Sequence, residues 1–119
     1  MRYSSYTTGI LEIDIQHTNI AFLLTELAKE GVEKEASEEM FEVLRNALTQ
    51  HFGFEEKWVQ TNNKNFDPDH RGSHKKLLDK LNELYNQYTN NKLNMREISL
   101  TTKIELLKHV QDHDMRLNA

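Results

Sequence analysis

Residues 40–58 read MFEVLRNALTQHFGFEEKW. Apolar side chains recur in this stretch at intervals of three and four residues, which is the period of an amphipathic α-helix. One stripe of that helix carries Met40, Phe41, Leu44, Ala47, Leu48, His51, Glu55 and Trp58. His51 and Glu55 are therefore expected one turn apart on the face that the helix buries. This placement predicts a helical fold with a polar site in its apolar interior.

Two further pairs of metal-capable side chains follow along the chain. His70 and His74 are again four residues apart, whereas His109 precedes Asp114 by five. At about 100° per residue, a spacing of five leaves two side chains roughly 140° apart on one continuous helix. His109 and Asp114 are therefore expected to approach a common point from the two flanks of an inward face, as a carboxylate bridging two metal ions could do.

A metal site explains why so many polar groups share apolar helix faces. The candidate ligands are His17, His51, Glu55, His70, His74, His109 and Asp114. A single pair is most often an accident on a solvated face, but burying all seven groups would be costly without a cation. Five imidazoles and two carboxylates exceed the needs of one tetrahedral zinc ion. They would nearly fill two six-coordinate ions, leaving one position open, if both carboxylates bridge and the ions share one exogenous oxygen. Ligand type alone leaves iron, manganese, zinc, cobalt and copper open.

Three more amphipathic segments accompany residues 40–58, and the chain is expected to be all-α. Gly31 is expected to end the first helix and Ser37 to cap the second, while Asn94 and Glu97 form a capping box for the fourth. The expected bounds are about 14–30, 37–58, 67–88 and 94–117. Short connections favour antiparallel neighbours, hence an up-down-up-down four-helix bundle with a di-metal site in its core.

Composition limits the class of protein. The 119 residues suit one domain over 1–119, and a net charge of −4 without a basic cluster argues against nucleic acid as a partner. No cysteine is present, so disulfides and thiolate metal sites are excluded. No signal-like segment or long apolar run occurs, which leads us to expect a cytoplasmic protein without membrane contact.

The chain resembles the hemerythrin family, specifically bacterial hemerythrin domains, along almost its whole length. The resemblance lies in GILEIDIQH at 9–17, HFGFEE at 51–56, the pair His70 and His74, and the pair His109 and Asp114. It implies that one iron is held by His70, His74 and His109, and a second by His17 and His51. It also implies that Glu55 and Asp114 bridge the two irons together with an oxo or hydroxo group. The second iron would keep one open position for dioxygen.

Three further residues are candidates around this site. Leu106 matches a family leucine that lines the oxygen pocket, although it suits an ordinary core position equally well. Glu105 stands where the family commonly has tryptophan, so it is either a solvated rim residue or a pocket carboxylate that promotes autoxidation or peroxide chemistry. His113 falls between His109 and Asp114 on the helical wheel and could donate to a ligand, replace one, or simply pack.

The leading hypothesis is reversible dioxygen binding by a bacterial oxygen carrier, store or supplier that performs no net turnover and is not an enzyme. One alternative is an oxygen- or redox-sensing domain of a larger signalling protein. Another is a di-iron peroxidase or oxidase, and a last one is a metal-free interaction bundle. Dioxygen is the expected partner, while a signalling or oxygen-consuming protein partner is left open.

Overall fold

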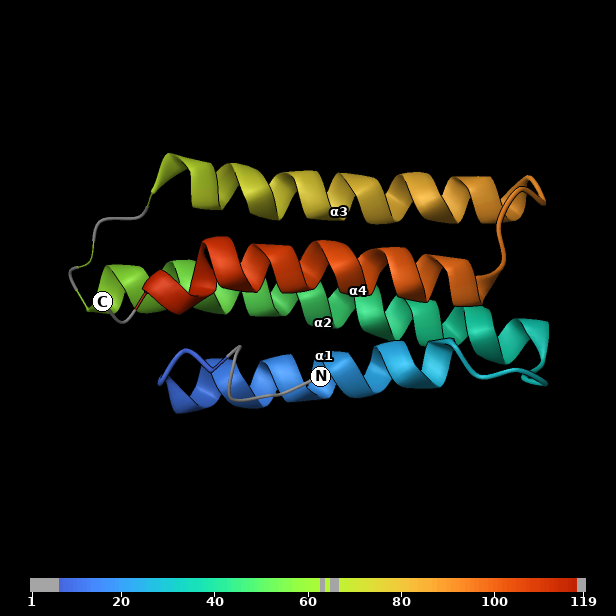
Figure 1. Ribbon diagram of the computed structural model, residues 1–119, viewed down its shortest axis with the longest axis horizontal. Helices are drawn as coiled ribbons and strands as arrows, with labels where there is room; N and C mark the ends of the chain where they lie inside the picture. The colour runs from blue at the N-terminus through green and yellow to red at the C-terminus, as the bar shows by residue number, and fades with distance from the viewer. Residues whose placement is uncertain (1–6, 63, 65–66, 118–119) are drawn as a thin grey trace.

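The computed structural model describes residues 7–62, 64 and 67–117. Its long helices are α1 (Leu11–Leu27), α2 (Lys34–Thr61), α3 (Pro68–Thr89) and α4 (Met95–Asp112), followed by the short 3-10 helix η2 (Asp114–Arg116). The described residues contain no strand. Figure 1 shows consecutive helices running in opposite directions, with α1 beside α2 and α4 beside α3. The predicted all-α four-helix bundle is confirmed.

The starts of α3 and α4 are stabilised by local side-chain caps. The side chain of Asp67 accepts a hydrogen bond from the backbone of Asp69 (3.0 Å), and Pro68 occupies the first helical turn. The Asn94 side chain accepts from the Glu97 backbone (2.8 Å), and the Glu97 carboxylate accepts from the Asn94 backbone (3.1 Å). The predicted capping box is therefore present.

The first two helices begin earlier than the sequence suggested. The carboxylate of Asp14 accepts from the backbone of Thr8 (2.8 Å) and from its hydroxyl (2.7 Å), which anchors the chain ahead of Leu11. Helix α1 ends at Leu27, and Gly31, with a φ of 77°, turns the following loop rather than capping the helix. Helix α2 starts at Lys34, so the prediction that Ser37 caps it was wrong.

The C-terminal end of the bundle also corrects the prediction. Helix α4 stops at Asp112 instead of continuing to Leu117, because His113 leaves the helical conformation with φ −127° and ψ −60°. Asp114 then opens η2 and is fully buried. His109 and Asp114 therefore do not lie on one continuous helix, and the break itself directs the Asp114 side chain into the bundle.

Apolar clusters enclose the candidate ligands on both sides along the helices. On α1, His17 lies between Ile13 and Ile20, which belong to different clusters. On α2, the pair His51 and Glu55 lies between Leu48 and Val59 in the same way. The candidate ligands thus form a polar layer between two water-excluding layers, where an unpaired charge is costly. Among the described helices, none is both long and apolar enough to cross a membrane.

Candidate metal centre

All seven candidate ligands meet in this polar layer, in two overlapping groups. Within each group the ligand atoms lie within 4.8 Å of one another. The larger group contains Glu55, His70, His74, His109 and Asp114, and the smaller contains His17, His51, Glu55 and Asp114. The two carboxylates are common to both groups. All of these side chains are buried except His17, which is 13% exposed.

Asp114 divides its two oxygens between the two groups. Its Oδ1 lies 2.9 Å from Nε2 of His70 and 2.9 Å from Nε2 of His109. Its Oδ2 lies 2.9 Å from Nε2 of His17 and 3.6 Å from Nε2 of His51. Each oxygen therefore faces a different set of histidines, which is the arrangement of a carboxylate that bridges two ions.

Glu55 divides its oxygens in the same sense. Its Oε1 contacts Nε2 of His51, whereas its Oε2 lies 2.9 Å from Nε2 of His70 and 3.5 Å from Nε2 of His74. Both oxygens are buried without a well-aligned hydrogen bond. Buried polar atoms of this kind call for a partner. A pair of cations between the histidines and the carboxylates would supply it.

The two carboxylates hold their protons very differently. Burial raises the pKa of Glu55 well above its ordinary value, and the charge of nearby Asp114 adds to the rise. Burial alone would also raise the pKa of Asp114, but hydrogen bonds from the imidazoles of His109 and His17 outweigh it and hold this pKa well below its ordinary value. Two carboxylates this close do not both ionise readily unless cations lie between them.

Two histidines of the larger group, His70 and His74, have pKa values shifted in opposite directions. Burial lowers the pKa of His70, but bonding to Asp114 and Glu55 more than compensates, so its pKa is raised. For His74, burial together with the charges of His109 and His70 lowers the pKa to about 2. His74 is therefore neutral at any ordinary pH, and a neutral imidazole is the form that binds metals.

Two residues outside the predicted set bind the outer nitrogens of the histidines. Oε1 of Gln16 lies 2.6 Å from Nδ1 of His51, and Oγ of Ser73 lies 2.6 Å from Nδ1 of His109. Sequence reasoning missed both. Each residue directly precedes a ligand in the chain, His17 or His74, but adjacency alone does not say which neighbouring helix a side chain meets.

A pocket of about 260 Å³ lies between α1 and α4 beside His17. Its walls include Leu24, Leu106 and Val110, which are buried. Its exposed lining residues include Thr18 and Lys103. Leu106 thus lies in the apolar core and also lines a cavity next to a candidate ligand.

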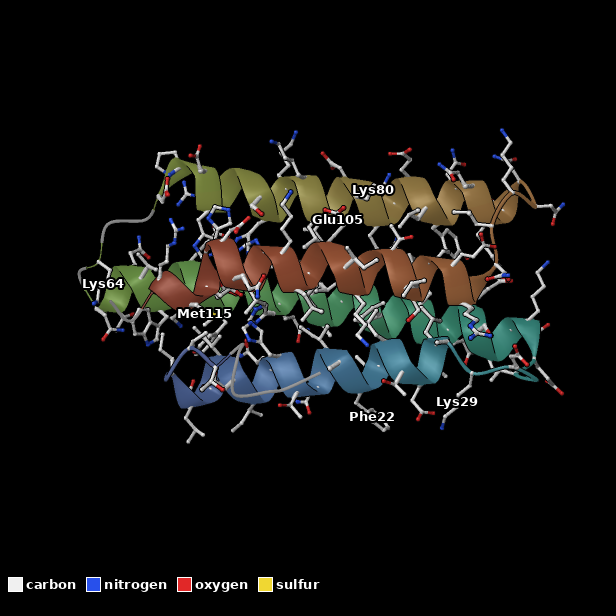
Figure 2. The ribbon with its side chains drawn as sticks, in the orientation of Figure 1. Phe22, Lys29, Lys64, Lys80, Glu105 and Met115 are labelled. Carbon is white, nitrogen blue, oxygen red and sulfur yellow. The ribbon has the colours of Figure 1, made fainter. Side chains whose placement is uncertain are left out.

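Glu105 does not line this pocket. It is exposed and lies on the side of α4 that faces α3 (Figure 2). There it lines a separate depression of about 420 Å³, whose lining also includes the candidate ligand His109. His113 also lines the depression, and its ring stacks on that of His70 with centroids 5.0 Å apart. His113 belongs to neither group of ligand atoms. These positions favour the solvated-rim interpretation of Glu105 and the packing interpretation of His113.

Two acidic residues near the ligands have structural roles. Asp14 anchors the start of α1, as described above. Glu56 pairs with Arg71 at 3.1 Å, and its other oxygen lies 4.0 Å from Nδ1 of His74. Neither belongs to a ligand group.

Comparison with known proteins returned no relative: no protein-family model matches this chain, and no curated protein or solved structure does.

Proposed function

We propose that this protein binds two iron ions side by side and binds dioxygen reversibly at one of them, as an oxygen carrier, store or supplier. The observation that carries the proposal is the orientation of Glu55 and Asp114, because each turns one oxygen to each group of histidines. A mononuclear site has no need for two carboxylates that are both shared in this way.

The donor set fits the proposed ions. His70, His74 and His109 would hold one iron, His17 and His51 the other, and the two carboxylates would bridge them. Imidazole and carboxylate suit iron, although they also accept other first-row metals. The resemblance of the ligand pattern to hemerythrins supports iron over manganese or zinc. The anionic carboxylates would offset part of the cationic charge within the apolar bundle.

The two positions differ in how much of their surroundings the protein supplies. One has three imidazoles, whereas the other has two and adjoins the pocket through His17. We therefore place dioxygen at the second position. A ferrous pair held by these residues would supply the electrons that dioxygen takes up on binding. The buried side chains of Leu24, Leu106 and Val110 give the pocket an apolar inner wall, which favours release of dioxygen over irreversible oxidation.

The test is an optical spectrum of metal-quantified protein, recorded in the diferrous form, after oxygen addition and after oxygen removal. We expect two irons per chain and an oxygen-dependent visible band that disappears on deoxygenation. Asp114→Asn, which removes the carboxylate charge, should lower iron loading and abolish the band. Wild-type protein that binds no iron, or whose band persists after oxygen is removed, would refute reversible oxygen binding.

One observation favours a second candidate, an oxygen- or redox-sensing site. The pocket beside His17 also has exposed lining residues, Thr18 and Lys103, so water can approach His17 from that side. An iron pair that water can reach is oxidised irreversibly more readily than one that is shielded from water. Rapid conversion of the diferrous protein to a stable ferric product would support this function, and turnover of added peroxide would indicate peroxidase chemistry instead.

A further inference from the structure

The candidate histidine ligands direct one ring nitrogen, Nε2, towards the carboxylates, and the other, Nδ1, points away from them. Nε2 of His17, His70 and His109 each lies 2.9 Å from an oxygen of Asp114. Nε2 of His51 contacts Glu55. The second nitrogen, Nδ1, then determines how firmly each ring is oriented, because a hydrogen bond there fixes both the tautomer and the ring plane.

Gln16 orients His51 across the interface between α1 and α2. Its amide oxygen, 2.6 Å from Nδ1 of His51, can only accept a hydrogen bond, so Nδ1 donates. With the proton on Nδ1, the lone pair of Nε2 is free to face a metal ion. Gln16 thus prepares His51 for coordination before any ion arrives.

Ser73 orients His109 across the interface between α3 and α4. Its hydroxyl lies 2.6 Å from Nδ1 of His109 and can accept a hydrogen bond from that nitrogen. Ser73 also lines the depression between α3 and α4, so its hydroxyl is placed between the buried centre and the surface. In the position formed by His70, His74 and His109, the ring of His109 is therefore oriented by a residue that is not itself a ligand.

His17 has no comparable support. Its Nδ1 is buried, and the described part of the chain offers it no hydrogen-bond partner. Its ring meets that of His51 edge to face at 4.7 Å and adjoins the pocket between α1 and α4. Of the two histidines in the smaller group, one is therefore anchored by Gln16 and the other is not.

We infer that Ser73 and Gln16 are positioning residues, one for each metal position, and that the ions bind in a fixed order. The His70, His74 and His109 position fills first, because it has one more imidazole and all three of its histidines are buried. The His17 and His51 position fills second and loses its ion first. This inference rests on the metal-binding half of the proposed function and is independent of dioxygen.

The test is a titration of metal-free protein with Co²⁺. Calorimetry measures the affinity of each step, and the visible absorption of the bound ion reports its coordination. Wild-type protein should bind two ions in two resolved steps with different spectra. His17→Ala should keep the tight step and lose the weak one. Ser73→Ala should weaken the tight step by about 10–100-fold, the usual effect of removing such a partner, while Ser73→Thr, which keeps the hydroxyl, should restore it.

Gln16→Met tests the other position with a side chain of similar length. It should weaken the second step and leave the first unchanged, whereas Gln16→Glu, which keeps an acceptor, should bind as wild type or more tightly. Gln50→Met is the matched control, because Gln50 is exposed and adjoins His51 in the chain. It should alter neither step. Thermal melting of each metal-free variant verifies that the fold is intact.

The outcomes separate this inference from the proposed function. Unchanged titrations of Ser73→Ala and Gln16→Met, or an equal weakening of both steps by either variant, would overturn the inference while leaving a two-metal protein. Absence of Co²⁺ binding in wild type would overturn the metal centre and the inference together. If two ions bind in order but the diferrous form does not bind oxygen, the inference is upheld and only oxygen binding is refuted.

Discussion

The ring of Phe52 stacks on the imidazole of His74, with centroids 4.1 Å apart and planes inclined by 16°. The stack joins α2 to α3 beside the candidate ligands and helps to leave His74 only 4% exposed. Burial, together with the charges of His109 and His70, lowers the pKa of His74 to about 2. The packing that completes the apolar core thus also keeps a ligand in its metal-binding form.

Replacing His74 with leucine should make the metal-free protein less sensitive to acid. In the unfolded chain His74 takes up a proton near its ordinary pKa of about 6.5, whereas in the folded chain its pKa is about 2. Its contribution is fully present above pH 6.5 and is lost as the pH falls towards 2, by up to about 1.4 kcal/mol per pH unit. Urea unfolding of both proteins at pH 7, 6 and 5 measures the difference.

Comparing how the unfolding free energy of the two proteins changes with pH separates the effect of His74 from that of groups whose pKa values are shifted in the opposite direction. Glu55 and His70 have raised pKa values in the folded chain, so their contributions are greatest at low pH and are lost as the pH rises through those values. They remain present in both proteins. Equal pH slopes for wild type and His74→Leu would show that His74 is not held neutral.

Metal binding should release protons. Glu55 has a pKa well above its ordinary value and His70 a raised one, so both hold protons more firmly in the metal-free protein than free side chains do. An ion that binds these groups displaces those protons, so the apparent affinity should rise with pH until both are deprotonated. Calorimetric titration at one pH in buffers of different ionisation enthalpy counts the protons. A binding heat independent of the buffer contradicts this expectation.

Leu106→Ala and Glu105→Gln should affect the oxygen site differently. Leu106 is a buried wall of the pocket beside His17, so its truncation should admit water and accelerate oxidation of the diferrous protein severalfold, besides costing about 2–5 kcal/mol of stability. Glu105 lies on the side facing α3, so Glu105→Gln should leave the oxidation rate unchanged. Rates of spectral decay in air measure both. Faster or slower decay in Glu105→Gln would show that Glu105 influences the oxygen site.

Two glycines inside helices can be replaced with a gain in stability. A Cβ added to Gly53 in α2 or to Gly72 in α3 would meet no atom within 4 Å, and neither glycine has a positive φ. Alanine should stabilise each helix by about 0.5–1 kcal/mol, because it reduces the conformational freedom of the unfolded chain. Thermal unfolding of Gly53→Ala and Gly72→Ala measures the gain. A lower melting temperature in either variant would indicate that the glycine serves another purpose there.

Much of the fold could be predicted because its signals are local. The stripe containing Leu44, Leu48 and His51 defines a helix from its period alone. The capping box of Asn94 and Glu97 acts within three residues, and it was correctly predicted. The starts of the first two helices were predicted less well. Asp14, which accepts a hydrogen bond from Thr8, lies inside an α1 that begins at Leu11, and Ser37 lies inside α2.

By itself, the sequence determined that four amphipathic helices form and that six of the seven potential ligands lie on their inward faces, because both follow from residue type and period. Only the tertiary structure decided how those groups meet. The break at His113 turns Asp114 inward, helix packing pairs Gln16 with His51 and Ser73 with His109, and it leaves Glu105 outside the pocket. These contacts depend on the rotation and axial offset of neighbouring helices, which are set by the packing of many side chains at once.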